Sequence, residues 1–528
     1  MSGALVLTLV SAAVAIAALA RRYGLPSPLV LVAAGLAASF IPGLPSIELD
    51  PDLVLYGVLP PLLFSASLDS SYMGLRANIR PVALLSVGLV LFTTVAVGAA
   101  AYLVSPTLGW PLALVLGAVV SPPDAVAATA IGRTLALPRR VLTVLGGESL
   151  LNDATALTAY RVAVAWAVGG TLSVGDGLAT FGLAVGVGVA VGLVLGFGAA
   201  LVLRWLSDAS VEVAVFLLVP FAAYALAEEA HGSGVLAVVA AGLWIGRQQH
   251  RMHYSTRLQG GSVVTTVDFV LETVVFGLIG LQLPAVISSL GDRPVREVVV
   301  LVTVVVAVVL VTRIVWIFPA TYLPRRLSRR IRERDPVPPV GNIVVLSWAG
   351  MRGVVTLGAA FALPLRDEAG QPLPGRDLVL FAAFAVVVAT LMVQGLSLPW
   401  LIRRLHLGSG EERDDALAEA QAAQEASDAA MSRLDELADD EEGQRYDGIV
   451  QELREMATAR ANAAWERLGP QGPHRSETPS EFFRRLRRDM LASERAVYVR
   501  YRDEGRIDDE VLRRVQRELD LEEARLSR

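Results

Sequence analysis

The sequence predicts an all-α membrane protein whose chain crosses the bilayer many times. Of its 528 residues, 54% are hydrophobic. From residue 3 to residue 405 they form long runs of Leu, Val, Ala and Ile, separated by short polar joints that contain Gly or Pro. A helix needs roughly 20 mainly apolar residues to cross the hydrocarbon core, and only helices or closed barrels satisfy their backbone there. The runs are longer than the strands of a membrane barrel, about ten residues, and they do not alternate.

Thirteen runs are predicted to be membrane-crossing helices, several of them short or interrupted by Gly and Pro. Their ranges are 3–20, 28–43, 53–68, 81–104, 110–131, 141–168, 177–204, 211–227, 233–246, 263–287, 295–322, 341–364 and 377–402. In a signal peptide, basic residues precede the apolar stretch, whereas Arg21 and Arg22 follow the first run. We therefore expect this run to be the first crossing helix.

Arginine residues gather in every second joint, which predicts the orientation of the chain. The odd joints carry Arg21, Arg22, Arg76, Arg80, Arg133, Arg139, Arg140, Arg204, Arg247, Arg251, Arg257 and the cluster from Arg325 to Arg334. The even joints hold only Arg293, Arg296, Arg366 and Arg376. Because basic joints stay in the cytoplasm, we expect a multi-pass protein of the plasma (inner) membrane. Its N-terminus is expected outside and its C-terminal part inside.

The chain changes character after residue 405, which predicts a transmembrane domain, 1–405, and a cytoplasmic helical tail, 406–528. The tail is rich in Ala, Glu, Arg and Leu with helical spacing, so we expect three or four amphipathic helices. One is predicted to begin after Thr478, because Pro479 takes the first helical position and Glu481 completes a capping box. A solvated or dimer-stabilising appendage is the simpler interpretation of the tail, and a regulatory sensor is the alternative.

Eight ionisable residues inside the predicted membrane-crossing runs stand out as candidates for a functional site. A charged side chain at the bilayer centre costs about 2.5–3.5 kcal/mol on insertion scales, and it usually faces the protein interior and marks an ion path. The eight residues are Asp124, Glu148, Asp153, Arg161, Asp268, Glu272, Arg313 and Arg352. They are the first candidates for a functional site.

Two prolines are predicted to break the run at 110–131. Pro122 and Pro123 cannot donate backbone hydrogen bonds, and they stand directly before Asp124 in "VVSPPDAVAATAI". A broken helix leaves free carbonyl and N–H groups that can bind a cation or a carboxylate, a device found in many secondary transporters. The alternative is a harmless proline kink with Asp124 near the membrane surface.

The segment "GGESLLNDATALTAYR", residues 146–161, carries an unusual density of polar groups. Glu148 and Asn152 share one helix face, and Ser149 and Asp153 share the neighbouring face. A carboxylate in a partly hydrated cavity can hold either H⁺ or Na⁺ but not both comfortably, which is the chemistry of exchange. Asn152 can coordinate or orient without adding charge. The alternative is a pair of structural carboxylates bound to arginines.

Arg352 lies in an otherwise apolar, Gly-rich run. An unpaired buried arginine is very costly, so a buried acid partner is expected. We expect Glu148 to be that partner, which leaves Asp153 free for the ion.

Two other arginines are less constrained by the sequence. Arg161 lies two turns beyond Asp153 and is expected closer to the outer surface of the membrane. Arg313 can pair with Glu272 or extend toward the membrane surface, and the sequence does not decide between the two.

Five blocks of the sequence resemble the cation/proton antiporter superfamily, in particular its Na⁺/H⁺ exchanger branch (NhaP/NHE-like). The blocks are "LPPLLFSASL" at 59–68, "SPPDAVAATAI" at 121–131, "GGESLLNDATAL" at 146–157, "FGLIGLQLP" at 276–284 and "SWAGMRGVVTLGAA" at 347–360. The resemblance covers residues 1–405. It implies thirteen helices with two inverted repeats, a homodimer, and a core domain that moves by an elevator-like step against a dimerisation domain.

The resemblance also implies roles for individual residues. Asp153 resembles the carboxylate that holds the cation and the proton in turn, and Ser149 resembles an auxiliary ligand, so the metal ion expected at these two residues is transported Na⁺. Asn152 resembles the asparagine associated with electroneutral one-for-one exchange. Asp124 resembles the acid of the broken helix.

Further positions follow the family pattern or depart from it. Glu148 and Arg352 resemble a structural ion pair, and Glu272 matches an acidic position found in many exchangers. Pro123 stands where members often have Thr, so a backbone carbonyl would replace a side-chain ligand of the ion. Ser65 stands where some members have Glu. Both departures bear on ion selectivity more than on the reaction.

The sequence thus predicts a secondary antiporter, not an enzyme, that exchanges Na⁺ or Li⁺ for H⁺ and serves pH and sodium homeostasis. A K⁺/H⁺ antiporter on the same scaffold is the closest alternative. The expected partners are monovalent cations, protons and the lipid bilayer, with no cofactor and no nucleic acid.

Other classes fit the sequence less well. It contains no phosphate-binding loop for an ATP-driven pump and no pore-loop filter for a channel. An intramembrane aspartyl enzyme could use Asp124 and Asp153 but would leave Asn152 and Arg352 unexplained. The lack of cysteine excludes disulfides and thiolate metal sites.

Overall fold

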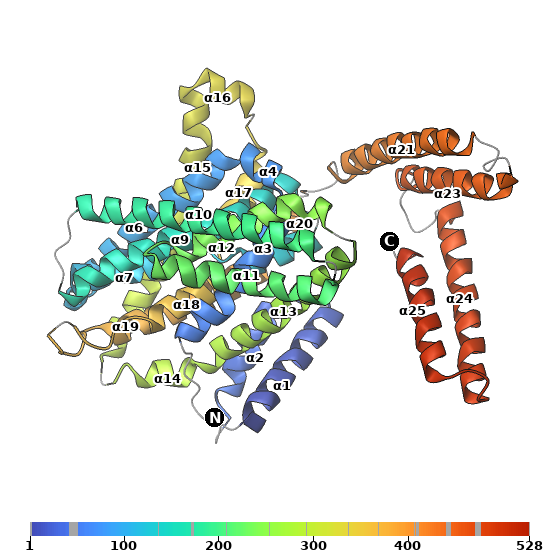
Figure 1. The fold of residues 1–528 in the computed structure, drawn as a ribbon. Coiled ribbons are helices and arrows are strands. Elements are labelled where there is room, and N and C mark those ends of the chain that lie inside the picture. Colours follow the sequence, from blue (N-terminus) through green and yellow to red (C-terminus); the bar gives the residue numbers. More distant parts are fainter. Residues whose placement is uncertain are drawn as a thin grey trace. The chain divides into compact units, whose positions relative to one another are not determined.

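The fold is described from a computed structural model of the chain (Figure 1). It describes residues 3–41, 51–135, 137–169, 174–206, 208–252, 254–291, 293–335, 337–367, 369–405, 407, 411–439, 445–469 and 477–526. The chain divides into two compact units, residues 1–407 and residues 408–528.

The first unit is built from helices, and within the described ranges its β structure is a single bridge between Arg366 and Pro372. The α-helices are α1 (Gly3–Arg22), α2 (Ser27–Ala38), α3 (Leu59–Asp69), α4 (Tyr72–Ala77), α5 (Ile79–Ala83), α6 (Val90–Val104), α7 (Gly109–Val120), α8 (Ala125–Thr134), α9 (Arg139–Val168), α10 (Val174–Trp205), α11 (Ala209–Glu229), α12 (Gly234–Gln248), α13 (Tyr254–Leu281), α14 (Leu283–Ser288), α15 (Val295–Leu327), α16 (Arg329–Arg334), α17 (Val340–Trp348), α18 (Val354–Phe361), α19 (Arg376–Thr390) and α20 (Leu396–Leu405). Shorter π-helical or 3₁₀ segments are Leu53–Val58, Leu84–Leu89, Pro106–Leu108, Gln249–Arg251 and Leu391–Gly395. The predicted all-α fold class is confirmed.

Each of the thirteen predicted runs contains helix. Among the described residues, six helical stretches are long and apolar enough to cross a membrane: Ile79–Val104, Ala179–Trp205, Ala209–Glu229, Thr256–Ser288, Val295–Leu327 and Arg376–Leu405. Shorter apolar stretches are Ser27–Ala38, Leu53–Asp69, Pro106–Val120 and Gly234–Gln248. Because several of the runs are short or broken, the count of thirteen crossings stays a prediction.

Two of the predicted runs are broken in the middle. Residues 121–124 separate α7 from α8, and residues 349–353 separate α17 from α18. In the first break, Pro122 and Pro123 cannot donate the hydrogen bonds that would continue α7. The predicted proline break is confirmed, whereas the second break was not anticipated from the sequence.

Helix α9 connects three hydrophobic cores of this unit, and it runs through the middle of the unit in Figure 1. The α7–α15 core is formed by buried side chains of α6, α7, α9, α15, α18 and α19. The α11–α12 core is formed mainly by α3, α10, α11 and α12, and the third core mainly by α1, α2, α8, α13, α17 and α20. Helix α9 contributes Tyr160 to the first, Ala154 to the second and Leu145 to the third. A side chain on α9 is therefore held in place from several directions.

Helices α2 and α13 approach each other at glycines. A β carbon on Gly35 would lie 2.5 Å from the carbonyl oxygen of Gly277, and one on Gly280 would lie 2.5 Å from that of Val32. Small residues at helix contacts let backbones come close, which strengthens packing in membranes.

The second unit contains four helices in its described part: α21 (Glu411–Ala438), α23 (Asp447–Glu466), α24 (Pro479–Asp503) and α25 (Asp509–Leu526). The predicted start of α24 is confirmed, because Thr478 and Glu481 form a reciprocal capping box with Pro479 at the first position. Helices α24 and α25 pair through a small apolar core of Leu491, Leu519 and Leu526.

Replacing Gly280 with Val is expected to destabilise the protein, because the added side chain overlaps the backbone of α2. Overpacking of this kind costs about 1–3 kcal/mol. Gly261→Val on the same helix is the matched control, since nothing lies within 4 Å of a β carbon there. Melting temperatures of the purified variants in detergent measure the difference, and equal values for both variants would contradict the close approach.

Candidate ion-binding site

The two helix breaks meet each other. The backbone N–H of Asp124 donates to the carbonyl of Met351 at 2.7 Å, and this bond joins the break after α7 to the break after α17. A β carbon on Gly353 would lie 1.8 Å from Oδ2 of Asp124, so the absence of a side chain at residue 353 admits the carboxylate. The other carboxylate oxygen, Oδ1, accepts from the backbone N–H of Val126 at 2.8 Å. Asp124 therefore lies where the two interrupted helices cross.

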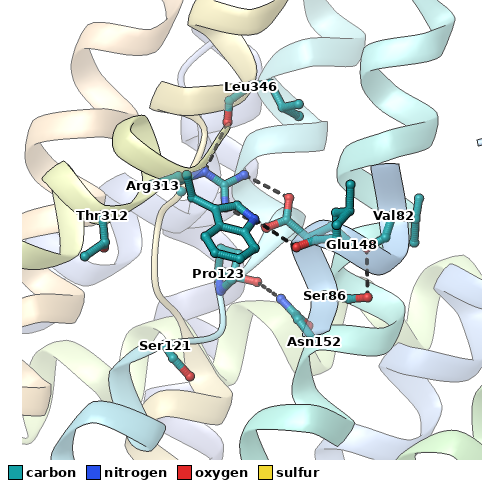
Figure 2. Close-up of polar contacts among 12 residues, drawn as sticks. Val82, Ser86, Ser121, Pro123, Glu148, Asn152, Thr312, Arg313 and Leu346 are labelled. Atoms are coloured by element: carbon teal, nitrogen blue, oxygen red, sulfur yellow. Dashed lines mark hydrogen bonds and ion pairs between the residues drawn. The ribbon is translucent and has the colours of Figure 1, made fainter. Parts of the chain in front are cut away.

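Helix α9 passes beside this crossing. The side-chain Nδ2 of Asn152 donates to the carbonyl of Pro123 at 2.7 Å, as Figure 2 shows. Asn152 is fully buried. The amide thus satisfies a carbonyl that the proline break leaves without a helical partner. This carbonyl is the one expected to replace the missing side-chain ligand, and its second lone pair is not used by Asn152.

A cavity of about 870 Å³ reaches the crossing. It brings together four of the predicted site residues, which are Asp124, Ser149, Asp153 and Glu272. Within the described part of the chain, the Asp153 carboxylate forms no hydrogen bond or ion pair and is open to this cavity. Asp153 is only 6% exposed, so the cavity is its route to water.

Glu148 is paired with Arg313, and the predicted pair of Glu148 with Arg352 is wrong. Nη1 and Nη2 of Arg313 donate to the two carboxylate oxygens of Glu148 at 2.6 and 2.9 Å (Figure 2). Both side chains are almost fully buried, with exposed fractions of 2% and 1%. Nε of Arg313 donates to the carbonyl of Leu346 at 3.1 Å. Neither alternative predicted for Arg313, a pair with Glu272 or extension to the membrane surface, is correct.

Arg352 is held by carbonyl groups instead of a carboxylate. Its Nε donates to the carbonyl of Val120 at 2.8 Å, its Nη2 to that of Ser121 at 3.4 Å, and its Nη1 to that of Gly350. These carbonyls include the end of α7, where the helix dipole places partial negative charge. The prediction that Arg352 needs an acidic partner is wrong because the C-terminus of a helix also stabilises a buried cation. Arg352 therefore fastens the two breaks together.

The sequence is similar to those of known proteins. Residues 9–404 match the family described as sodium/hydrogen exchanger, transmembrane. The chain belongs to the sodium/hydrogen exchanger family. It is a cation/proton antiporter, which confirms the prediction of a transporter and not an enzyme.

The similarity to relatives covers most of the chain. It is 34% identical over 542 residues to an uncharacterized Na⁺/H⁺ exchanger of Mycobacterium tuberculosis, with 99% of this chain and 95% of that protein covered. It is 32% identical over 390 residues to the sodium, potassium, lithium and rubidium/H⁺ antiporter of Bacillus subtilis, covering 71% of this chain and 58% of that protein. The solved structure of the sodium proton antiporter MjNhaP1 from Methanocaldococcus jannaschii shares the fold, with a TM-score of 0.56 at 16% identity over 76% of this chain and 97% of that chain.

Two accessory residues of the exchanger have partners that the sequence did not reveal. Arg161 donates through Nη2 to both carboxylate oxygens of Glu228, at 2.7 and 2.6 Å. Glu228 lies in the last turn of α11, beside a joint with few arginines. An acidic residue without a nearby basic one was the signal in the sequence that could have pointed to it as the partner of Arg161. Ser65 donates to Asp268 on α13 and is not among the residues that line the cavity.

An ionic cluster around Asp335 lines part of the cavity. Arg140 and Arg325 bind its carboxylate, the latter at 2.6 Å, and Arg80 lies 3.7 Å away. Burial alone would raise the pKa of Asp335, but hydrogen bonds from Arg140 and Arg325 hold this pKa below its ordinary value. The carboxylate is therefore charged at neutral pH and ties α5, α9 and α15 together at this end. Sequence reasoning did not single out Asp335.

Replacing Arg313 with Met is expected to destabilise the exchanger by about 3–5 kcal/mol, because Glu148 would be left buried without a counter-charge. The double variant Glu148→Leu/Arg313→Met should recover most of this loss. Thermal unfolding followed by size-exclusion chromatography measures both effects. A double variant no more stable than Arg313→Met alone would contradict the buried pair as the cause.

Proposed function

We propose that the exchanger carries Na⁺, or Li⁺, in one direction and H⁺ in the other at Asp153, one for one and without net charge transfer. The observation that carries this proposal is the difference between the two carboxylates of α9. Glu148 is neutralised by Arg313. Asp153 is open to the cavity and has no partner within the described residues.

The cavity offers the chemistry that a small cation needs. Na⁺ is bound by oxygen, and the oxygens that face the cavity here include the carboxylates of Asp153 and Asp124 and the hydroxyl of Ser149. A buried carboxylate is unfavourable as a bare anion, so it gains from binding either a proton or a cation. Competition between the two for Asp153 couples the movement of one to the movement of the other.

Asn152 supports the proposed stoichiometry. The residue beside Asp153 is a neutral amide that holds the Pro123 carbonyl, so this part of α9 offers one carboxylate and not two to the ion. One carboxylate that alternates between one proton and one monovalent cation carries the same charge in both directions of the cycle.

We also propose the larger arrangement on which such a cycle depends. Thirteen crossings with two inverted repeats would place the breaks after α7 and α17 at corresponding positions, as in other transporters with midplane sites. An elevator-like movement of a core domain in a homodimer would expose the site to each side in turn. The N-terminus is proposed to lie outside the plasma membrane and the tail in the cytoplasm, with pH and sodium homeostasis as the role.

Potassium is the second candidate cation. The relative from Bacillus subtilis is described as a sodium, potassium, lithium and rubidium/H⁺ antiporter, so this scaffold does not restrict its members to small cations. Transport assays with Na⁺, Li⁺ and K⁺ in parallel decide between the two candidates.

Asp153→Asn is expected to abolish cation-dependent proton movement in proteoliposomes, at least tenfold below the native rate. Glu297→Gln is the matched control, because Glu297 is an acid of the same domain that accepts from Ser105 at 2.7 Å and does not line the cavity. Undiminished exchange by Asp153→Asn would remove Asp153 from the mechanism.

Asn152→Asp is expected to make exchange respond to membrane potential, since this part of α9 would then offer two adjacent carboxylates to the ion instead of one. Exchange by the native protein should not change when a potassium diffusion potential is imposed with valinomycin. The rate of pH change in proteoliposomes, with and without the potential, measures this. A native rate that follows the potential would refute the electroneutral assignment.

A further inference from the structure

One face of α9 runs from the ion-binding site to the far end of the helix. Ser149, Asp153, Leu157 and Arg161 follow at intervals of four residues, so each lies one turn beyond the previous one and beside it on the helix surface. The residues of α9 that line the cavity extend from Arg139 to Asp153 and include none beyond it. The cavity therefore opens toward the start of α9 and ends at Asp153.

Leu157 occupies the next turn of this face. Its side chain is half-buried and packs against both the α7–α15 core and the α11–α12 core. An apolar side chain packed between two cores disfavours water beside Asp153 in this direction.

One turn further, Arg161 and Glu228 form an ion pair between the same two cores. The neighbours of Arg161 on α9, Tyr160 and Ala163, belong to the α7–α15 core, whereas Ala227, next to Glu228, belongs to the α11–α12 core. Glu228 also accepts from the backbone N–H of Gly234 at 3.1 Å, which fixes it to the start of α12. The pair thus ties together two parts of the molecule that have separate apolar interiors.

The two ion pairs of α9 differ in how easily they can open. The Glu148–Arg313 pair is buried, with exposed fractions of 1% and 2%. In the outer pair, Arg161 is 48% exposed and Glu228 is 18% exposed. An exposed pair is weak because water can replace each partner, whereas a buried pair is costly to separate. Of the two, the Arg161–Glu228 pair is suited to break and re-form during a cycle.

We propose that Leu157 and the Arg161–Glu228 pair form the gate that closes the ion site on the side to which the cavity does not open. The pair separates when the site turns to that side, and it re-forms when the site returns. This inference rests on the proposed function of Asp153 as the transported ion's site.

Cross-linking tests the gate, because the chain contains no cysteine and introduced thiols are the only ones present. Arg161→Cys/Glu228→Cys, joined by a short bis-methanethiosulfonate linker that spans the length of the original side chains, is expected to lose at least tenfold in exchange rate. Reduction of the linker should restore the rate. Arg293→Cys/Asp377→Cys is the matched control. This partly exposed pair, 28% and 21%, joins the segment just before α15 to the start of α19, and both helices belong to the α7–α15 core, so its linker should leave exchange unchanged.

Thiol labelling gives a second measurement that does not depend on transport. Leu157→Cys should react slowly with a membrane-impermeant reagent applied from the side of the Arg161 end. Adding Arg161→Gln should speed this reaction about fivefold, the size expected from the loss of one exposed ion pair. Leu142→Cys, which lines the cavity, should react only from the opposite side and at an unchanged rate.

The outcomes separate this inference from the proposed function. Normal exchange by the linked Arg161→Cys/Glu228→Cys protein would overturn the gate, and so would labelling of Leu157→Cys that ignores Arg161→Gln. Both measurements use protein that retains Asp153. If Asp153→Asn exchanges normally while the linker still blocks transport, the ion site is wrong but the pair still spans a moving boundary.

Discussion

Glu148 and Arg313 are opposite charges buried at the centre of the transmembrane unit, and the rest of the site depends on their pairing. The two-pronged contact at 2.6 and 2.9 Å gives both carboxylate oxygens a donor, and the carbonyl of Leu346 accepts from Nε of Arg313. Separating such a pair costs about 3–5 kcal/mol, so it persists while other parts move. In the proposed exchange cycle this pairing keeps Glu148 from binding the ion, although Glu148 is only five residues from Asp153 on the same helix.

The crossing of the two broken helices is stabilised by a different means. Neither break is held by a charge pair: Asn152 satisfies the Pro123 carbonyl, and Arg352 satisfies the carbonyls at the end of α7. The amide of Asn152 and the guanidinium of Arg352 fix the backbone of the breaks without adding a carboxylate to the cavity. Asp124 and Asp153 can therefore face the same cavity while one acid of α9 remains neutralised. The groups that hold the fold, Asn152 and Arg352, bind backbone carbonyls. The carboxylate proposed to exchange ions is thus separate from them.

Much of this arrangement could be predicted from the sequence, and the predictions that were wrong or missing have identifiable physical reasons. Apolar runs predict helices, and Pro122 and Pro123 predict the break after α7, because both follow from local backbone chemistry. Asp124, Ser149 and Asp153 were expected at one ion site and Glu272 only as an accessory residue, and the cavity brings all four together. The partners of buried arginines depend on the level and rotation of distant helices, which a sequence does not encode locally. Arg352 was therefore given the wrong partner, and neither alternative considered for Arg313 included Glu148. Glu228 and Asp335 were overlooked.

The central claim is that Asp153 alone trades a proton for a cation while Glu148 stays paired. The most direct test counts the protons released when Na⁺ binds to purified exchanger in weakly buffered detergent solution at neutral pH, with bound Na⁺ measured in parallel. The account predicts one proton released for each Na⁺ bound. Release of two protons per Na⁺, or Na⁺ binding without proton release, would contradict it.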